Sequence, residues 1–548
     1  MMLLTDFFQL LRSQFVRIHE NKVEYSFVFA IFLFGFLFFL WIFLRNQLVP
    51  MIDGPYYRIQ VRSLITTGQI VYGDPPLAFI LMSIPSLLFG DVSLGVKIGV
   101  TFFSALSTVP AYFLMKRVGK SKLAGFASMV LIIFSGIFIR AMSDFMKNVI
   151  GICWLLAFVY YLHDIAVSGI KKTNLALAAV FLVLTGLTHI LAFGIALLFI
   201  AFYTVVSVIF NVNRHSFLKA SGTLFLTVCV FVIVASVFFG SLFTDFSKAL
   251  SFMNQVLLFE GNKVQGTVAQ NPVGALRTRP VINSMDSFSL SLIGGWEVIL
   301  AILLVGALLS FYAWRKQEKD ALILLSTVTF VGAILSFPLL PNDLLGRFLL
   351  MMVIPITVLL SYGISKIWTL GGRDLKFFAV ILVVVCLVLF VGQSFKAISA
   401  INPSIRPDVY ADLVGMQSSV PSDSVIVTIR GSGLGYWVEY VENVDVVDIQ
   451  ELKGELWQSY STVLGIFPNN QVPPIPHSTI YVGNIYALVC LQCGHNHRFF
   501  LTIVIDIKEY RDDVWLLETV SWGLGQCNRL VLPQPSCETG LYPAYLHA

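Results

Sequence analysis

Charged residues are scarce in this chain. Only 12% of its 548 residues are Asp, Glu, Lys or Arg, whereas 57% are hydrophobic. Soluble domains carry roughly a quarter charged residues, so the composition excludes an ordinary soluble protein and indicates a polytopic membrane protein. The formal net charge of +5 is small, and no long basic run is present. A nucleic-acid partner is therefore not expected.

The sequence also lacks an internal repeat, a low-complexity segment and a small-residue cleavage pattern after its first apolar run. We therefore interpret that run as a signal anchor that stays in the membrane. A spanning helix needs about 20 mostly apolar residues. By that criterion we predict eleven spans, at about 26–44, 93–115, 123–140, 146–162, 174–186, 189–211, 217–244, 293–314, 320–337, 348–365 and 377–395.

Two shorter segments follow the first span. The run 77–89 is too short to cross a membrane and is interrupted by Pro85, so it predicts a helix lying in the interface. Residues 54–67 predict another short helix, with Pro55 well placed in its first turn. Between the fifth and sixth spans, the segment from Gly186 to His189 predicts a break.

Lysine and arginine are denser in the connections that lie inside if the N-terminus is cytoplasmic. The positive-inside rule therefore predicts a cytoplasmic N-terminus, and eleven spans then place the C-terminal region outside the cell membrane. We expect a transmembrane catalytic domain over residues 1–399, with outer loops at 45–92 and 245–292. Loops as long as the second are more often functional lids than filler.

Residues 400–548 predict a soluble extracytoplasmic α/β domain. Strands are expected at 424–429, 445–449, 478–483, 499–506 and 514–519, and a helix at 436–440. Gly431, Gly433 and Gly435 follow the first strand, but their spacing differs from a dinucleotide-binding fingerprint, and we interpret them as a turn.

Cysteine is sparse, with seven residues in the chain. Three lie inside apolar runs, where a thiol behaves as a small hydrophobe. The other four are Cys490, Cys493, Cys527 and Cys537. They predict disulfides if this region is extracellular. The alternative is a metal site, because His495 and His497 follow the first pair.

Two acids on the expected outer face are candidates for catalysis. Asp53 follows the first span and precedes Pro55. It could simply cap the short helix, or act as a general base or metal ligand, because burial raises the pKa of a carboxylate. Asp144 lies in the turn between the third and fourth spans, where a turn or capping role is the alternative. Together the two acids could hold a divalent ion such as Mg, Mn or Zn.

Cations share that expected face. Arg347 begins a span, where an arginine is costly unless it snorkels or pairs. A lipid phosphate would satisfy it, because arginine matches phosphate geometry. Arg58 and Lys147 could assist, although contact with lipid headgroups is the alternative for each. His189 lies in the break between two spans, where a helix-packing hydrogen bond is the commoner role.

The order of these motifs resembles the GT-C superfamily of membrane glycosyltransferases. The resemblance starts with an outer acid followed by Tyr56 and Tyr57, and then Asp74-Pro-Pro-Leu77. It continues through Ser143-Asp144 and Gly346-Arg347-Phe348, and ends in the glycine-aromatic segment 433–440. Members of this superfamily include protein O-mannosyltransferases, aminoarabinose transferases of lipid A and oligosaccharyltransferases, and they use polyprenyl-phosphate-linked sugars.

The resemblance implies roles for particular residues. Asp53 matches the catalytic base or metal ligand, Asp144 the second acid, and Arg347 the arginine near the lipid phosphate. As further substrate-binding candidates we take Tyr56, Tyr57, Arg58, Lys147 and His189. The chain departs from oligosaccharyltransferases at Tyr436-Trp437-Val438, where they carry Trp-Trp-Asp, and it has a single acid in the second motif. These departures favour single-sugar transfer over sequon glycosylation and leave metal dependence open.

The sequence therefore predicts inverting sugar transfer from a polyprenyl-phosphate donor to a protein, lipid or glycan acceptor at the outer membrane surface. The alternatives are a polytopic transporter or lipid flippase and a non-catalytic membrane assembly subunit. Transporters tend to show two similar halves and broken helices near the midplane, and the sequence displays neither clearly.

Overall fold

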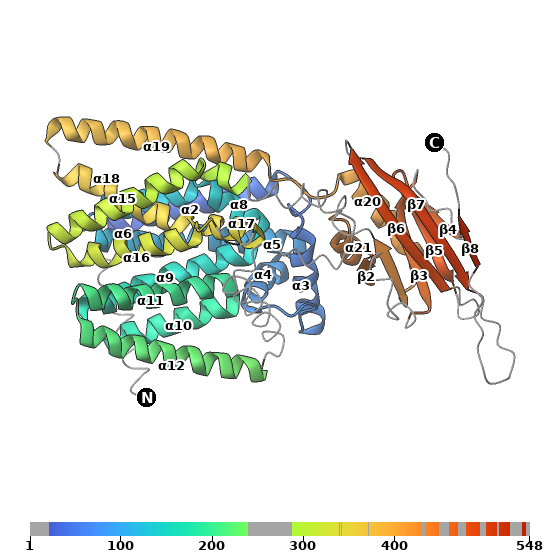
Figure 1. Ribbon diagram of the computed structural model, residues 1–548, viewed down its shortest axis with the longest axis horizontal. Helices are drawn as coiled ribbons and strands as arrows, with labels where there is room; N and C mark the ends of the chain where they lie inside the picture. The colour runs from blue at the N-terminus through green and yellow to red at the C-terminus, as the bar shows by residue number, and fades with distance from the viewer. Residues whose placement is uncertain are drawn as a thin grey trace. The chain divides into compact units, whose positions relative to one another are not determined.

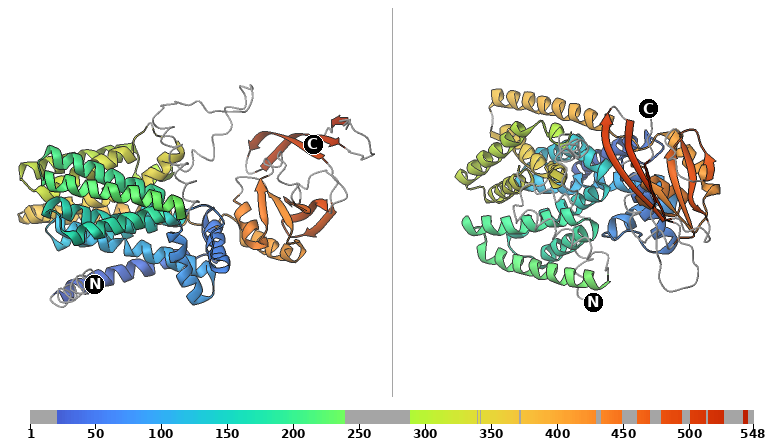
Figure 2. Two further views of the ribbon diagram at one scale, coloured as in Figure 1. Left: turned by 90° about the horizontal axis from the view of Figure 1, so that it is seen from below. Right: turned by 45° about the vertical axis from the view of Figure 1, so that its right-hand side comes forward.

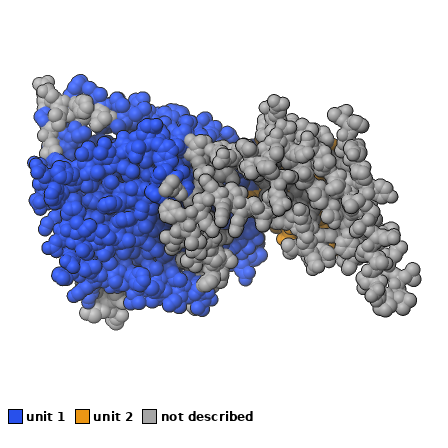
Figure 3. Space-filling model, viewed as in Figure 1, with its two compact units in different colours: residues 1–266, 279–402 blue, residues 267–278, 403–548 orange. Residues whose placement is uncertain are grey.

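The structure is a computed structural model that describes eleven separate stretches of the chain. They are residues 21–238, 288–338, 340, 342–370, 372–428, 433–448, 460–469, 478–493, 500–511, 514–525 and 540–543. The chain divides into two compact units (Figure 3). The first comprises residues 1–266 and 279–402, and the second comprises residues 267–278 and 403–548.

The first unit is a bundle of helices, which Figure 1 draws with their long axes in roughly one direction. In chain order its helices are α2 (Lys22–Leu44), α3 (Gly54–Thr67), α4 (Leu77–Phe89), α5 (Val92–Leu106), α6 (Thr108–Val118), α7 (Lys122–Ile133), α8 (Gly136–Asp144), α9 (Met146–Ser168), α10 (Lys172–Thr188), α11 (Ile190–Ile209), α12 (Arg214–Phe238), α15 (Trp296–Arg315), α16 (Lys319–Leu335), α17 (Asn342–Met351), α18 (Val353–Leu370) and α19 (Arg373–Ser399).

Each predicted span overlaps one of these helices or two consecutive ones. Among the described residues, seven helices are long and apolar enough to cross a membrane, or eight if α7 and α8, which meet at 51°, form one bent span. The predicted break near His189 is confirmed, since α10 ends at Thr188 and α11 begins at Ile190. The chain is a multi-pass helical membrane protein. The count of eleven spans and the orientation of the termini stay predictions.

The helices α3 and α4 lie at one end of the bundle (Figures 1 and 2). The predicted short helix is confirmed as α3, with Pro55 in its first turn and Gly68 ending it at a φ of 74°. Helix α4 packs closely against α5 because a glycine of α5 faces it. A Cβ on Gly95 would lie 2.3 Å from the Cα of Ser86. The close approach of α5 thus fixes the position of α4 at this end.

Helix α9 lies in the centre of the bundle. In its apolar window 83% of the residues are buried, compared with 17% for α15 and 22% for α12 at the periphery. Lys147 is the second residue of α9, so a predicted site residue is carried by one of the most enclosed helices of the unit. A site held by a packed helix keeps its geometry better than one on a loop.

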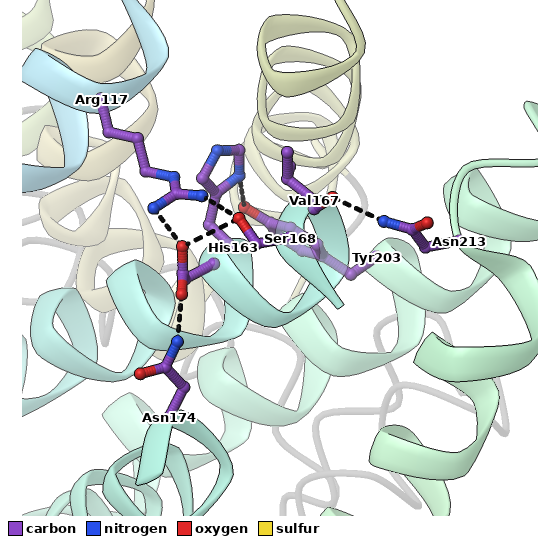
Figure 4. Close-up of polar contacts among 8 residues, drawn as sticks. Arg117, His163, Val167, Ser168, Asn174, Tyr203 and Asn213 are labelled. Carbon is purple, nitrogen blue, oxygen red and sulfur yellow. Dashed lines mark hydrogen bonds and ion pairs between the residues drawn. The ribbon is translucent and has the colours of Figure 1, made fainter. Parts of the chain in front are cut away.

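The other end of α9 carries a polar cluster, shown in Figure 4. Arg117 of α6 forms an ion pair with Asp164 of α9, which also accepts a hydrogen bond from Asn174 of α10. Next to Asp164 in the sequence, the Nδ1 of His163 lies 3.2 Å from the hydroxyl of Tyr203 on α11. Four helices are therefore joined by polar contacts. Asp164 follows Lys147 by 17 positions, which in a helix is about 26 Å, so the cluster is remote from that lysine.

We expect Asp164→Asn to destabilise the bundle by about 3 kcal/mol, because it leaves the guanidinium of Arg117 without its buried counter-ion. Asp164 is only 9% exposed in its side chain. The measurement is thermal unfolding of the purified protein in detergent. Glu297→Gln, which changes an exposed acid at the start of α15, is the control and should leave the transition unchanged. Equal transitions for both variants would contradict the bracing role.

The second unit contains two sheets with helices packed on the first. Its elements are α20 (Pro407–Met416), η2 (Gln417–Ser419), β1 (Ser424–Thr428), α21 (Gly435–Glu442), β2 (Asp445–Asp448), β3 (Thr462–Pro468), β4 (Ser478–Val482), β5 (Tyr486–Cys493), β6 (Phe500–Arg511), β7 (Val514–Gly525) and β8 (Gly540–Pro543). The first sheet has the order β2-β1-β3-β5-β4, and β6, β7 and β8 form the second. The predicted α/β character of this region is confirmed.

The sheet contains a β-α-β unit. Strand β1 runs parallel to both β2 and β3, while β5 is antiparallel to β3 and β4. Helix α21 connects β1 to β2 and buries Trp437, whose indole N–H donates to the hydroxyl of Ser404 at 2.9 Å. The five predicted strands correspond to β1, β2, β4, β6 and β7, whereas β3, β5 and β8 were not predicted.

One buried acid holds α20 against the β4–β5 turn. The carboxylate of Asp412 accepts hydrogen bonds from the backbone N–H groups of Asn484, Ile485 and Tyr486 at 2.7 to 3.1 Å. These bonds lower the pKa of Asp412 against the opposing effect of burial. Gly483 makes room for the contact, because a Cβ there would lie 2.6 Å from the Asp412 carboxyl carbon.

Cys490 is disulfide-bonded in the structure, which favours the disulfide interpretation over a metal site. Cys153, Cys229 and Cys386 are free thiols, as expected for the apolar runs. The side chains of the remaining C-terminal cysteines, the two histidines that follow Cys493, Gly431 and most of the predicted lid at 245–292 lie outside the described residues.

Candidate functional site

The backbone before Asp53 is held by several contacts. The ammonium of Lys97, buried on α5, donates to the carbonyls of Asn46 and Gln47 at 2.6 and 2.8 Å. The backbone N–H of Met51 donates to the carbonyl of Asn402 at 2.9 Å, and Met51 has a φ of 64°, which is uncommon for a residue other than glycine. Strained backbone of this kind is often found next to functional residues.

Asp53 occupies the position that precedes α3, but its side chain does not cap the helix. The backbone carbonyl of Asp53 accepts from Tyr57 at 3.1 Å, as the helix requires. The carboxylate of Asp53 therefore does not take the capping role that was considered for it. Gly54 allows the tight entry to α3, because a Cβ there would lie 2.9 Å from the carbonyl oxygen of Val49.

The charges around Asp53 come from three other segments. Burial raises the pKa of Asp53, and the nearby charge of Asp74 raises it further, while the positive charges of Lys147 and Arg347 lower it. Asp144 also lies within electrostatic range of Asp53. Burial outweighs the two cations, so the carboxylate of Asp53 is a stronger base than an ordinary exposed carboxylate.

Tyr57 follows Asp53 by one helical turn. Its side chain is buried, and its hydroxyl oxygen accepts a hydrogen bond from the backbone N–H of Lys147 at 3.4 Å. Burial and the charge of Asp53 raise the pKa of Tyr57 well above its usual value. The phenol therefore stays neutral, and it connects the first turn of α3 to the first turn of α9.

Asp144 has a cation of its own. Its carboxylate lies 2.5 Å from the guanidinium of Arg140, one turn earlier on α8. The guanidinium also lies 4.9 Å from the ring centre of Phe288 and 4.0 Å from the sulfur of Met51. Arg140 therefore connects α8 to the strained segment before Asp53.

Lys147 lies between an acid and two aromatic rings. Its ammonium is 2.8 Å from the carboxylate of Asp74, and both side chains are largely buried. It also lies 5.4 Å from the ring centre of Tyr56 and 5.7 Å from that of Phe79. Asp74 was not among the predicted site residues. The available signal was its place before two prolines, in the segment between α3 and α4.

Arg347 lies on α17 and is exposed. Its guanidinium is 5.4 Å from the ring centre of Phe145, the residue between α8 and α9. Together with its effect on Asp53, this contact places Arg347 next to the cluster. Arg58 is buried on α3 within electrostatic range of Lys97 on α5. Lys97 is the residue whose ammonium binds the backbone carbonyls before Asp53.

His189 caps α11, as its place in a helix break suggested. Its Nδ1 accepts a hydrogen bond from the backbone N–H of Leu191 at 3.2 Å. The charges of Lys147 and Arg347 lie within electrostatic range of the ring. Because Nδ1 is an acceptor, the ring is neutral and its proton is assigned to Nε2, which can serve as a donor.

The predicted site residues thus form one neighbourhood, built on α3, α8, α9, α17 and the α10–α11 break. Its chemistry combines one carboxylate of raised pKa with two cations and a neutral imidazole. The arrangement suits an anionic ligand and proton abstraction from a neutral group. It fits a divalent ion less well, because Asp144 is bonded to Arg140 and Asp74 to Lys147. Within the described residues, no three His, Cys, Asp or Glu side chains converge on one point.

The fold is similar to several solved membrane enzymes. The oligosaccharyltransferase of Archaeoglobus fulgidus in complex with Zn and sulfate matches with a TM-score of 0.54 and 15% identity, over 79% of this chain and 67% of that one. ArnT from Cupriavidus metallidurans bound to undecaprenyl phosphate matches with a TM-score of 0.52 and 11% identity, over 86% of this chain and 98% of that one.

The archaeal oligosaccharyltransferase tethered to an acceptor peptide with an NVT sequon also matches, with a TM-score of 0.52 and 12% identity, over 81% of this chain and 69% of that one. No protein-family profile and no curated protein sequence matches the chain. The likeness is therefore one of fold, found over most of the chain. This protein has the fold of the GT-C superfamily of membrane glycosyltransferases.

Proposed function

We propose that this protein transfers a sugar from a polyprenyl-phosphate-linked donor to an acceptor hydroxyl at the membrane surface. The observation that carries the proposal is the position of Asp53. This carboxylate has a raised pKa and lies within range of Lys147 and Arg347. A base beside two cations is what the displacement of a phosphate leaving group needs. The likeness to ArnT bound to undecaprenyl phosphate supports the class of donor.

In the proposed reaction, Lys147 and Arg347 bind the phosphate of the donor, and the neutral His189 offers a further hydrogen-bond donor. Asp53 removes the proton from the acceptor hydroxyl as its oxygen bonds to the anomeric carbon. The bond between that carbon and the phosphate oxygen breaks, and polyprenyl phosphate leaves with the electron pair. A single displacement of this kind inverts the anomeric centre. Asp53 then releases its proton to water.

The buried rings complete the site. Tyr57 keeps Asp53 and the start of α9 in register through its hydrogen bond to Lys147. Tyr56 and Phe79 face Lys147, and their faces stabilise its positive charge. We assign the two tyrosines to positioning and to binding of the donor. Asp144 orients Arg140 on the same helix, and Arg140 in turn contacts Met51 and Phe288.

The first test is sugar transfer in proteoliposomes, with a panel of radiolabelled polyprenyl-phosphate sugars and candidate acceptors, with and without EDTA. We expect transfer from at least one donor. Because cations of the chain carry the phosphate charge, we expect the rate to change less than about twofold on chelation. A loss of activity that returns with Mg, Mn or Zn would contradict the second expectation. Asp53 and Asp144 would then be the first ligands to test.

Failure of transfer from every donor, with added metal ions, would contradict the proposal itself. Lipid or solute flux across the bilayer would be the next assay, because a transporter shares the many spans and the buried polar groups. Absence of both activities would leave the non-catalytic assembly subunit. The identity of the sugar and the acceptor would follow from the donor and acceptor that support transfer.

A further inference from the structure

Asp74, which forms an ion pair with Lys147, has no role in the displacement described above. The two groups are 2.8 Å apart, and their side chains are only 10% and 14% exposed. The carboxylate and the rings of Tyr56 and Phe79 enclose the ammonium. A phosphate that binds Lys147 must therefore either share the ammonium with Asp74 or displace it.

Sharing is unfavourable because both ligands are anions. Two oxygens bonded to one ammonium lie roughly 5 Å apart, and repulsion at that distance is strong in a site that excludes most water. The repulsion increases with the charge of the phosphate. In the proposed reaction that charge changes, since the donor is a diester with one negative charge and the product is a monoester with about −1.5 to −2 at neutral pH.

The change in charge creates a problem of release. Lys147 and Arg347 attract the product more strongly than the donor, and a tightly held product makes its release rate-limiting. An anion that stays beside Lys147 opposes this retention, because it penalises the doubly charged monoester most. Asp74 is in that position, and it re-forms its pair with Lys147 when the phosphate leaves.

We propose that Asp74 is a resident counter-ion that competes with the phosphate for Lys147 and thereby speeds release of the polyprenyl phosphate product. The inference rests on the proposed function. In this role Asp74 is a positioning residue, because it acts through Lys147 and forms no bond to the reacting atoms.

The test is equilibrium binding of two radiolabelled probes to the full-length protein in detergent, a short-chain polyprenyl phosphate and its methyl diester. We expect Asp74→Asn to bind the monoester about tenfold more tightly and the diester at most about threefold more tightly. Lys147→Gln should weaken both. In the Asp74→Asn, Lys147→Gln double variant, the tighter binding of the monoester should vanish, because the competition needs both Asp74 and Lys147. Asp74→Glu, which keeps the charge, should behave as wild type.

Glu318→Gln is the matched control. Glu318 pairs with Lys366 at 2.7 Å, and Lys366 follows Arg347 by 19 positions, which corresponds to roughly 28 Å of helix. This variant should bind both probes as wild type does. The inference is overturned if folded Asp74→Asn binds the monoester no more tightly than wild type. It is also overturned if Asp74→Asn raises the affinity for the monoester by the same factor in the Lys147→Gln background.

Wild-type protein gives a second test, which does not depend on the folding of any variant. If Asp74 competes with the phosphate for Lys147, the dissociation constants of the monoester and the diester for wild type should agree within about threefold. A wild-type preference for the monoester above about thirtyfold would overturn the inference. If wild type binds neither probe, the proposed class of donor fails and the inference fails with it. Binding of both probes without an effect at Asp74 leaves the proposed function standing and removes the inference alone.

Discussion

Replacement of Asp53 by asparagine is expected to lower kcat for sugar transfer by about 10³-fold while the affinity for polyprenyl phosphate changes little. A general base contributes about 10² to 10⁴ to a rate, and asparagine keeps the shape of the side chain without its basicity. The phosphate is assigned to Lys147 and Arg347, which this substitution leaves in place. The measurement is the single-turnover rate of transfer, with probe binding measured on the same preparation.

The pH dependence of transfer gives an independent signature of the same group. Asp53 must be deprotonated to accept a proton, so activity is present above its pKa and is lost as the pH falls through it. Because burial raises the pKa of Asp53, the wild-type rate should decline at a higher pH than an ordinary carboxylate would give. The residual activity of Asp53→Asn should lack this acidic limb.

A second aspartate serves as the control for this experiment. Asp91 precedes α5 as Asp53 precedes α3, but its carboxylate does cap the helix, accepting from Ser93 and Leu94 at 2.7 and 3.2 Å. Asp91→Asn should cost some stability and leave the transfer rate and its pH profile unchanged. Full activity of Asp53→Asn would refute the assignment of the base.

Local patterns predicted the segment around Asp53 well. Proline in a first turn is a strong helix signal, and together with the mixed pattern of residues 54–67 it identified α3 with the bounds that the structure has. The break at His189 was also evident from local residues. Long apolar runs likewise predicted the helices of the bundle, because in a membrane each segment must satisfy its backbone hydrogen bonds internally.

Contacts between distant segments could not be predicted in this way. Asp74 and Lys147 are far apart in the sequence, and their pairing depends on how α4, α5 and α9 pack. The same holds for the strands β3 and β5, which lie inside the sheet. Strand β3 contains Gly465 and ends at Pro468, and both residues weaken a strand signal, whereas pairing with β1 and β5 overrides it.

The side chain of Asp53 illustrates the difference. Its sequence position allowed both a helix cap and a base, and the sequence gives no means to choose between them. In the structure the carboxylate leaves the helix end uncapped and lies among charges contributed by α9, α17 and the segment before α4. The role of Asp53 therefore depends on charges from distant segments that the tertiary fold brings together, and a local sequence pattern does not contain this information.

Replacement of Arg347 by methionine is expected to lower kcat/KM by about 10²-fold. The guanidinium is assigned to the donor phosphate, where negative charge increases as the bond to the sugar breaks, and losing one such electrostatic contact costs about 10² to 10³ in rate. Arg347→Lys should lose about tenfold, because an ammonium keeps the charge but lacks the planar fork that matches phosphate and stacks on a ring. The measurement is the initial rate of transfer at several donor concentrations.

Arg315 is a close control for this variant. Its guanidinium lies 5.9 Å from the ring centre of Phe311, much as that of Arg347 lies over Phe145, but it ends α15 and belongs to no cluster with Asp53. If Arg347 served only to stack on a ring or to anchor a helix end at the lipid headgroups, both methionine variants would lose stability together and keep their rates. Loss of rate in Arg347→Met alone would instead require a charged partner in the reaction. The order wild type, lysine, methionine would then show that this partner requires both the charge and the planar fork of the guanidinium, as a phosphate does.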